Sequence, residues 1–147
     1  MEKLPPIKKI YEAYSALADG RISFSESGPE AYVVSSDGAK RYTIRWDGTH
    51  YTSNDSATYW AGYPGYPVLA VWMKQGILPV NEEIAGWFGN VNWNALNRKY
   101  KRNYAKAAEE LLNERNLDSE TVRRDAEYIY EKLRGLDYTV GRGKGRP

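Results

Sequence analysis

Residues 59–76 read YWAGYPGYPVLAVWMKQG and divide a strand-like half of the chain from a helix-like half. The first part, residues 59–66, is aromatic, with glycine and proline between the rings. The second part, residues 67–76, is apolar until Lys74, which predicts a short helix that is buried on most sides. We therefore interpret the stretch as the hinge and the central core segment of an α+β domain.

Four runs upstream of the hinge have the alternation and composition of β-strands. They are Arg21–Glu26, Ala31–Ser36, Ala39–Trp46 and Thr49–Ser53. Two Asp-Gly pairs separate the last three runs, and Asp-Gly is among the strongest short-range signals of a β-hairpin. The runs therefore predict a four-stranded antiparallel meander. With Asp-Gly as each two-residue turn, Ser36 faces Ala39 and Trp46 faces Thr49.

This pairing sorts the side chains onto two faces of the predicted sheet, because residues that are directly opposite share a face. The face expected to meet the core carries Ala31, Val33, Tyr42, Ile44, Trp46 and Tyr51. The face expected to be exposed to solvent, called the wet sheet face below, carries Tyr32, Val34, Arg41, Thr43, Arg45, His50 and Thr52.

The rest of the chain predicts helices. One helix precedes the strands, starting after Pro5-Pro6 and ending near Gly20. Downstream, apolar spacing predicts a short helix after Asn81, a long helix over residues 93–113, and a last helix from Asp118 to Gly135. The predicted fold is α+β: an N-terminal helix, an antiparallel four-stranded meander, and a helical C-terminal half packed on one sheet face. Residues 1–136 form a single domain, and residues 137–147 form a flexible basic tail.

Composition excludes several classes of site. The chain has no cysteine, which removes disulfides and thiolate chemistry. The longest apolar run, Val68–Met73, is far too short to span a membrane, and the start of the chain lacks the apolar segment of a signal peptide, so we expect a cytoplasmic protein without a membrane partner. The one histidine lies in a predicted strand, and no nucleophile elbow is present. We therefore expect no catalytic residue, no metal and no cofactor, and the sequence favours a binding protein over an enzyme.

Basic residues support the leading hypothesis, a nucleic-acid-binding or nucleic-acid-associated domain without catalysis. The candidate residues come from the wet sheet face, the predicted long helix and the tail: Arg41, Arg45, His50, Arg98, Lys101, Arg102, Lys106, Arg142 and Lys144. Cations near aromatic rings suit single-stranded nucleic acid. Glutamates follow the helix cations at once, which is also typical of an ordinary solvated helix face.

Two alternatives stay open. The hinge aromatics and two adjacent polar residues could line a pocket for a sugar or a nucleoside-like ligand, because rings stack while amide and carboxylate groups orient the ligand. The candidate pocket residues are Tyr51, Asn54, Asp55, Tyr59, Trp60, Tyr63 and Tyr66. Exposed tyrosine and tryptophan could instead form the interface of a homodimer.

Overall fold

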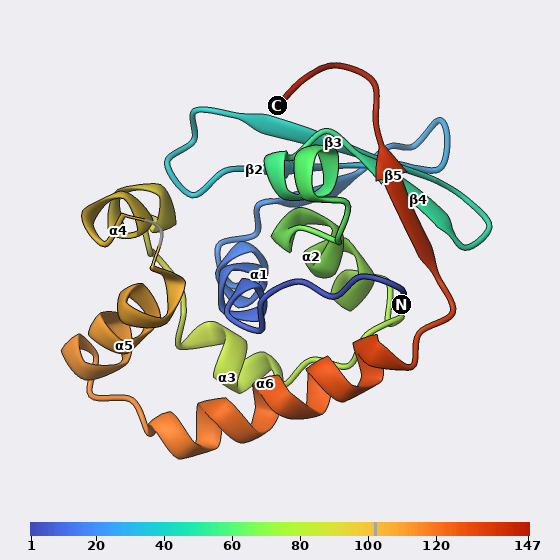
Figure 1. Cartoon of the computed structure of the whole chain (residues 1–147). Coiled ribbons are helices and arrows are strands. Elements are labelled where there is room, and N and C mark those ends of the chain that lie inside the picture. Colours follow the sequence, from blue (N-terminus) through green and yellow to red (C-terminus); the bar gives the residue numbers. More distant parts are fainter. Residues whose placement is uncertain (102) are drawn as a thin grey trace.

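A five-stranded sheet lies over a layer of helices in the computed structural model, which describes residues 1–101 and 103–147 (Figure 1). In chain order the elements are α1 (Lys9–Ala18), β1 (Ile22–Phe24), β2 (Glu30–Val34), β3 (Arg41–Asp47), β4 (His50–Ser53), the π-helix η1 (Ala57–Ala61), α2 (Tyr66–Lys74), α3 (Glu82–Gly86), α4 (Trp93–Lys99), α5 (Tyr104–Glu114), α6 (Ser119–Arg134) and β5 (Thr139–Arg142). The predicted α+β class, with an N-terminal helix and a helical C-terminal half, is confirmed.

The sheet has the order β1-β2-β3-β4-β5. Its first four strands form the predicted antiparallel meander. The fifth strand corrects the prediction of a flexible tail over residues 137–147, because Thr139–Arg142 pairs in parallel with β4. The sequence signal was weak, since β5 has only four residues and includes Gly141, and glycine is depleted in strands. Its partner β4 also lies some ninety residues earlier in the chain.

Of the two registers predicted from the Asp-Gly turns, the structure confirms the first and corrects the second. The predicted pairing of Ser36 with Ala39 matches the observed register, in which Val34 lies opposite Arg41. The second prediction was wrong by one turn position: Asp47 pairs with His50, so Gly48 and Thr49 form the turn. Gly48 has a φ of 58°, which glycine adopts at little cost. The pairing moved by two residues, so each side chain kept its predicted face.

The core lies between the helices and the lower face of the sheet as drawn in Figure 1. Ala31, Val33 and Ile44 are fully buried on that face, as predicted. Residues 67–73 of α2 are all buried, which confirms the predicted buried helix. Trp72 meets the Tyr51 ring edge to face with centroids 5.4 Å apart, and so joins α2 to β4.

The C-terminal half differs from the prediction at one point. The long helix expected over residues 93–113 is two helices, α4 and α5. Lys101 has a φ of 52°, and the Asn103 side chain accepts a hydrogen bond from the Lys106 N–H at the start of α5. Asparagine favours such N-cap positions over helix interiors, which explains the new start. The last helix is confirmed, with Asp118 as its N-cap and Gly135 at its end.

Candidate nucleic-acid interface

The face of the sheet opposite the helices carries a cross-strand pair of a ring and a cation. Arg41 begins β3 and is exposed, and its guanidinium carbon lies 4.2 Å from the centre of the Tyr32 ring on β2. These two residues lie diagonally across the antiparallel pair, where long side chains meet. The arrangement is a cation–π contact that remains open to solvent.

Arg45 and Glu30 lie beside this contact on the same face. The Arg45 Nε donates to Glu30 Oε2 at 3.0 Å, and the Arg45 side chain stays 48% exposed. A hydrogen bond from Tyr32, helped by Arg45, lowers the pKa of Glu30 below its usual value. The same bond to Glu30 raises the pKa of Tyr32. The face therefore holds an ordered set of charges rather than independent side chains.

His50 lies at the junction of β4 and β5. Its Nδ1 is 2.7 Å from Thr139 Oγ1. The Cβ of a residue larger than glycine at position 141 would come within 3.3 Å of the His50 ring. The imidazole thus helps to join β5 to the sheet at this end.

A small hollow of about 70 Å³ lies on the open face where the chain leaves β5. It is lined by Thr43, Arg45, Thr52, Gly143 and Lys144. The Gly143 N–H donates to the Ser53 carbonyl at 2.9 Å, and a Cβ at position 143 would lie 3.0 Å from the Ser53 carbonyl carbon. This close approach brings Lys144 to the hollow, and Figure 1 shows the C-terminal segment crossing above the sheet.

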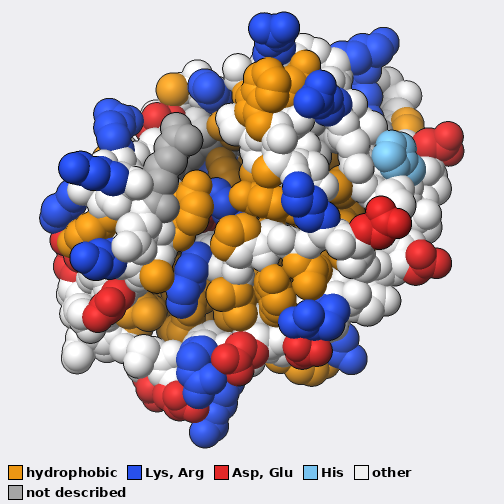
Figure 2. All heavy atoms as spheres, viewed as in Figure 1, with side chains coloured by type: hydrophobic (Ala, Val, Ile, Leu, Met, Phe, Trp, Pro, Cys, Tyr) orange, Lys and Arg blue, Asp and Glu red, His pale blue; other side chains and the backbone are white. Residues whose placement is uncertain are grey.

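The helix cations lie elsewhere. Arg98 and Lys101 are exposed on α4 and the turn after it, and Lys106 is exposed on α5. Arg102, also predicted to take part, lies outside the described residues. Figure 2 shows one group of basic side chains over the α4 and α5 region and a second group near the sheet. The eight described residues of the predicted set therefore do not form one patch.

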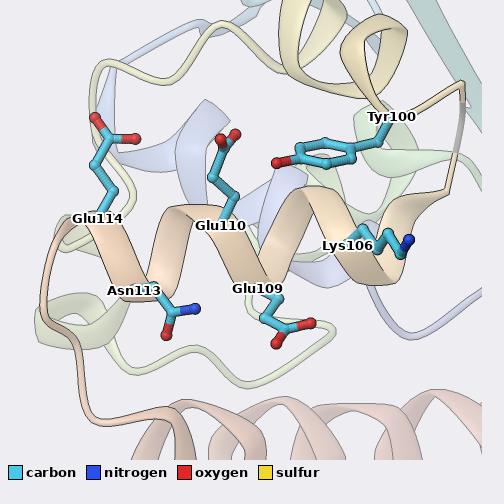
Figure 3. Close-up of a pocket in the computed structure, with 6 residues that line it drawn as sticks. All are labelled: Tyr100, Lys106, Glu109, Glu110, Asn113 and Glu114. Atoms are coloured by element: carbon cyan, nitrogen blue, oxygen red, sulfur yellow. The ribbon is translucent and has the colours of Figure 1, made fainter.

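Acidic side chains accompany the helix group. Lys99 Nζ donates to Glu110 Oε1 at 2.7 Å. A shallow open groove of about 680 Å³ lies along α5, and Lys106 shares its lining with Glu109, Glu110 and Glu114. Figure 3 shows these side chains projecting from α5. Tyr100 and Asn113 complete this lining. The charge of this region is mixed, which is less suited to a phosphate backbone than the open sheet face.

Part of the predicted aromatic pocket is packed or hydrogen-bonded within the fold. Tyr51 is buried, and its hydroxyl donates to Gln75 Oε1 at 2.8 Å. The Tyr66 ring meets Tyr42 edge to face, and burial raises the pKa of Tyr66. Asp55 is buried and accepts from the Thr58 N–H at 3.1 Å. The Asn54 side chain accepts from the Thr43 N–H at 2.9 Å.

The other part of that set lies outward at the end of β5. Trp60 is 61% exposed and meets Tyr59 edge to face, with ring centroids 4.7 Å apart. Arg142 Nε donates to the Tyr59 carbonyl at 2.8 Å, and its guanidinium carbon lies 4.8 Å and 5.6 Å from the Tyr59 and Trp60 ring centres. Tyr63 lies apart from this pair, half-buried near Lys9 and Tyr104, and burial raises its pKa. The structure thus separates the seven residues into an inward group, the outward pair Tyr59 and Trp60, and Tyr63.

One polar cluster was missed by sequence reasoning. Lys9 and Glu12 are buried on α1, with Nζ and Oε2 3.1 Å apart. Asn97 of α4 donates to Glu12 Oε1 at 2.9 Å, and Lys9 Nζ lies 4.3 Å from the Tyr104 ring centre. Burial lowers the pKa of Lys9, but Glu12 and Tyr104 outweigh it, so the pKa is raised. A Lys/Glu pair three residues apart is ordinary on a solvated helix, so no sequence signal marked this pair as buried.

Residues 1–101 and 103–147 contain no cluster of three or more histidine, aspartate or glutamate side chains placed to hold a metal ion. Within the same residues, no helix has the length and apolar character needed to cross a bilayer.

A family model described as "Uncharacterised conserved protein UCP014422" matches residues 2–139 of the 147-residue chain. No curated protein matches the chain, and no solved structure matches it.

Proposed function

The chain belongs to the family that its residues 2–139 match, and we propose that it is a small binding domain that holds single-stranded nucleic acid on the open face of its sheet. The observation that carries the proposal is the Arg41 guanidinium stacked on Tyr32, beside the half-exposed Arg45. This contact lies on the face of the sheet opposite the helices.

The chemistry of this face suits a single strand. Unpaired bases present flat rings that can stack on Tyr32, beside which the exposed Arg41 guanidinium can contact a phosphate, and such stacking is worth about 1–3 kcal/mol per base. Arg45 and Lys144 lie close enough to the same hollow to contact phosphates along the strand. In a duplex the bases stack on one another, so these rings would add little. We therefore expect single strands to bind more tightly than duplexes.

The helix cations have a smaller part in this proposal. Lys99 is already bound to Glu110, and Lys106 shares its groove with three glutamates. A phosphate placed there would meet carboxylates as well as ammonium groups, so the attraction would be weak.

The test measures fluorescence anisotropy of labelled oligonucleotides of about twelve nucleotides, a length within the site sizes of single-strand binders. Single-stranded RNA, single-stranded DNA and duplex DNA are titrated at about 50 and about 200 mM salt. With about three cations on phosphates, single-strand affinity should fall roughly 20-fold between these two conditions.

Matched double variants locate the surface. Arg41→Gln with Arg45→Gln should weaken single-strand binding about tenfold or more, because each charged hydrogen bond contributes about 1.5–3 kcal/mol. Arg98→Gln with Lys106→Gln removes the same charge from the helices and should leave affinity within about twofold. Absence of salt-sensitive binding at micromolar protein would overturn the proposal. Equal losses of affinity in the two double variants would show that the binding site is not on the open face of the sheet.

A second candidate function rests on the exposed Trp60 beside Arg142. An exposed ring with a guanidinium next to it can stack a nucleoside or a sugar, which keeps the small-ligand alternative open. Titration of nucleosides and of simple sugars, followed by tryptophan fluorescence, should show saturable quenching that Trp60→Ala removes. Light scattering on the wild type and on Trp60→Ala separates this role from a homodimer interface.

A further inference from the structure

The hollow at the C-terminal end of the sheet has an unusual lining for a space on a protein surface. Its side chains are two cations, Arg45 and Lys144, and two hydroxyls, Thr43 and Thr52. Glycine at position 143 completes the lining without a side chain. Each of these four side chains can donate hydrogen bonds, and the lining contains no carboxylate.

Arg45 remains able to serve a ligand although it pairs with Glu30. The bond to Glu30 is made by Nε at 3.0 Å. A guanidinium has five N–H donors, so this bond leaves the terminal nitrogens with four. Glu30 also fixes the side chain in one orientation, which reduces the entropy lost when a ligand binds.

The size of the hollow limits what it can hold. Its volume of about 70 Å³ exceeds the roughly 10–15 Å³ that a single water needs. It is far below the roughly 300–1,000 Å³ of pockets that enclose a drug-sized ligand. A compact tetrahedral group fits this range, whereas a whole nucleotide does not.

We propose that this hollow is a binding site for one phosphate group, held by Arg45 and Lys144 and by the hydroxyls of Thr43 and Thr52. The identity of the phosphate as part of a nucleic-acid backbone rests on the function proposed above. The same chemistry would also accept free phosphate, so the experiment separates the two sources.

The glycine-rich run at residues 141–146, GRGKGR, is explained by this site. Gly141 and Gly143 allow the segment to lie against His50 and Ser53, where a Cβ would come within 3.3 Å and 3.0 Å of their atoms. Arg142 and Lys144 then take different roles, with Arg142 beside Tyr59 and Lys144 at the hollow. Arg142 and Lys144 are therefore placed individually and do not act only as diffuse charge.

The experiment titrates isotope-labelled full-length protein with inorganic phosphate and follows backbone amide shifts by NMR. Sodium chloride at matched ionic strength is the reference. Phosphate should give saturable shifts at Thr43, Thr52, Gly143 and Lys144. Lys144→Gln should weaken phosphate binding about tenfold or more, because it removes a charged hydrogen-bond donor. Arg146→Gln removes the same charge two residues later and should leave phosphate affinity within about twofold. Thr52→Val is a further variant that keeps the side-chain volume while it removes one donor, and it should also weaken phosphate binding.

A second titration, with the single-stranded oligonucleotide, distinguishes the outcomes. If phosphate binds and competes with the oligonucleotide, the hollow holds a backbone phosphate. Saturable phosphate binding without oligonucleotide binding would support a free-phosphate site and overturn the proposed function. If oligonucleotides bind while phosphate and chloride give equal shifts, and Lys144→Gln behaves like Arg146→Gln, the phosphate site is overturned and the proposed function stands.

Discussion

The two faces of the sheet differ completely, although their residues alternate along the same strands. In β3, Ile44 is fully buried, whereas Arg41 and Arg45 on either side of it are exposed. The covered face meets α1 and α2, and the open face carries the cation–π contact and the small hollow. Stability thus depends on side chains that point to the covered face, and the proposed binding depends on side chains that point to the open face. A substitution on one face can therefore change one property and leave the other unchanged.

The strongest test of this comparison is Ile44→Ala on the covered face. Removal of a fully buried side chain should lower the free energy of unfolding by about 2–5 kcal/mol, through lost burial and a residual cavity. Urea denaturation followed by tryptophan fluorescence measures the change. The control is Arg41→Ala on the open face, which should stay within about 0.5 kcal/mol of the wild type. Similar losses of stability in the two variants would show that the two faces do not differ in their contribution to stability.

The second test concerns Gly65, which precedes α2 and packs tightly against the buried Asp55. A Cβ at Gly65 would clash with Asp55 Oδ2, so Gly65→Ala must displace the buried carboxylate that accepts from the Thr58 N–H. We expect a loss of about 1–3 kcal/mol in the free energy of unfolding. Thermal unfolding checks it, with Gly28→Ala as the control, because a Cβ there meets no atom within 4 Å. An unchanged melting temperature for Gly65→Ala would show that this end is less constrained than its contacts indicate.

The third test separates stacking from charge on the open face. Tyr32→Leu should weaken single-strand binding by about 1–3 kcal/mol while the salt dependence stays the same, because the ring contributes stacking. Arg41→Gln should reduce the salt slope by about 0.7, since it removes one phosphate contact. Anisotropy titrations over a range of salt concentrations measure both quantities. A lower salt slope in Tyr32→Leu would mean that the ring acts only by holding Arg41.

The smallest expected effect is a pH dependence at the Asp37-Gly38 turn, which joins β2 and β3. The pKa of Asp37 is lowered from 3.8 to about 2, chiefly by the Ala39 N–H, then by Asn94 and Ser35. A lowered pKa stabilises the fold above the unfolded value of 3.8, and this contribution is lost as the pH falls toward 2.

We therefore expect Asp37→Asn to show a shallower loss of stability than the wild type as the pH falls from about 4 to about 2. The measurement is the urea midpoint at several pH values. Asp47→Asn, at the end of β3 just before the second turn, is the control. Identical pH profiles for the wild type and Asp37→Asn would show that the turn bonds do not favour the ionised carboxylate.

Much of the sheet could be predicted because its signals are local. Alternation placed Val33 and Ile44 on the covered face and Arg41 and Arg45 on the open face, since side chains on a strand point to alternate sides. The error at the second turn left these faces unchanged, because a shift of two residues preserves the alternation. The candidate residues Arg41 and Arg45 were therefore available from the sequence.

Other features depend on partners that are distant in the chain. Lys144 reaches the hollow because β5 pairs with a strand some ninety residues earlier. The separation of Arg98 and Lys106 from the sheet cations depends on how α4 and α5 pack. Spacing along a helix indicates which residues share its face, but it does not indicate which other charges lie nearby.

The hinge at residues 59–76 contains one part whose structure the sequence determined and one part whose structure depended on tertiary contacts. Its apolar second half determined a buried helix by itself, because a segment without a polar side must be covered on most sides. Only the tertiary structure decided which rings of the aromatic first half are buried and which are exposed. Tyrosine and tryptophan have both an apolar ring and a polar group, so either burial or exposure satisfies them. Contacts from distant segments placed Tyr66 against Tyr42 and left Trp60 outside, next to Arg142.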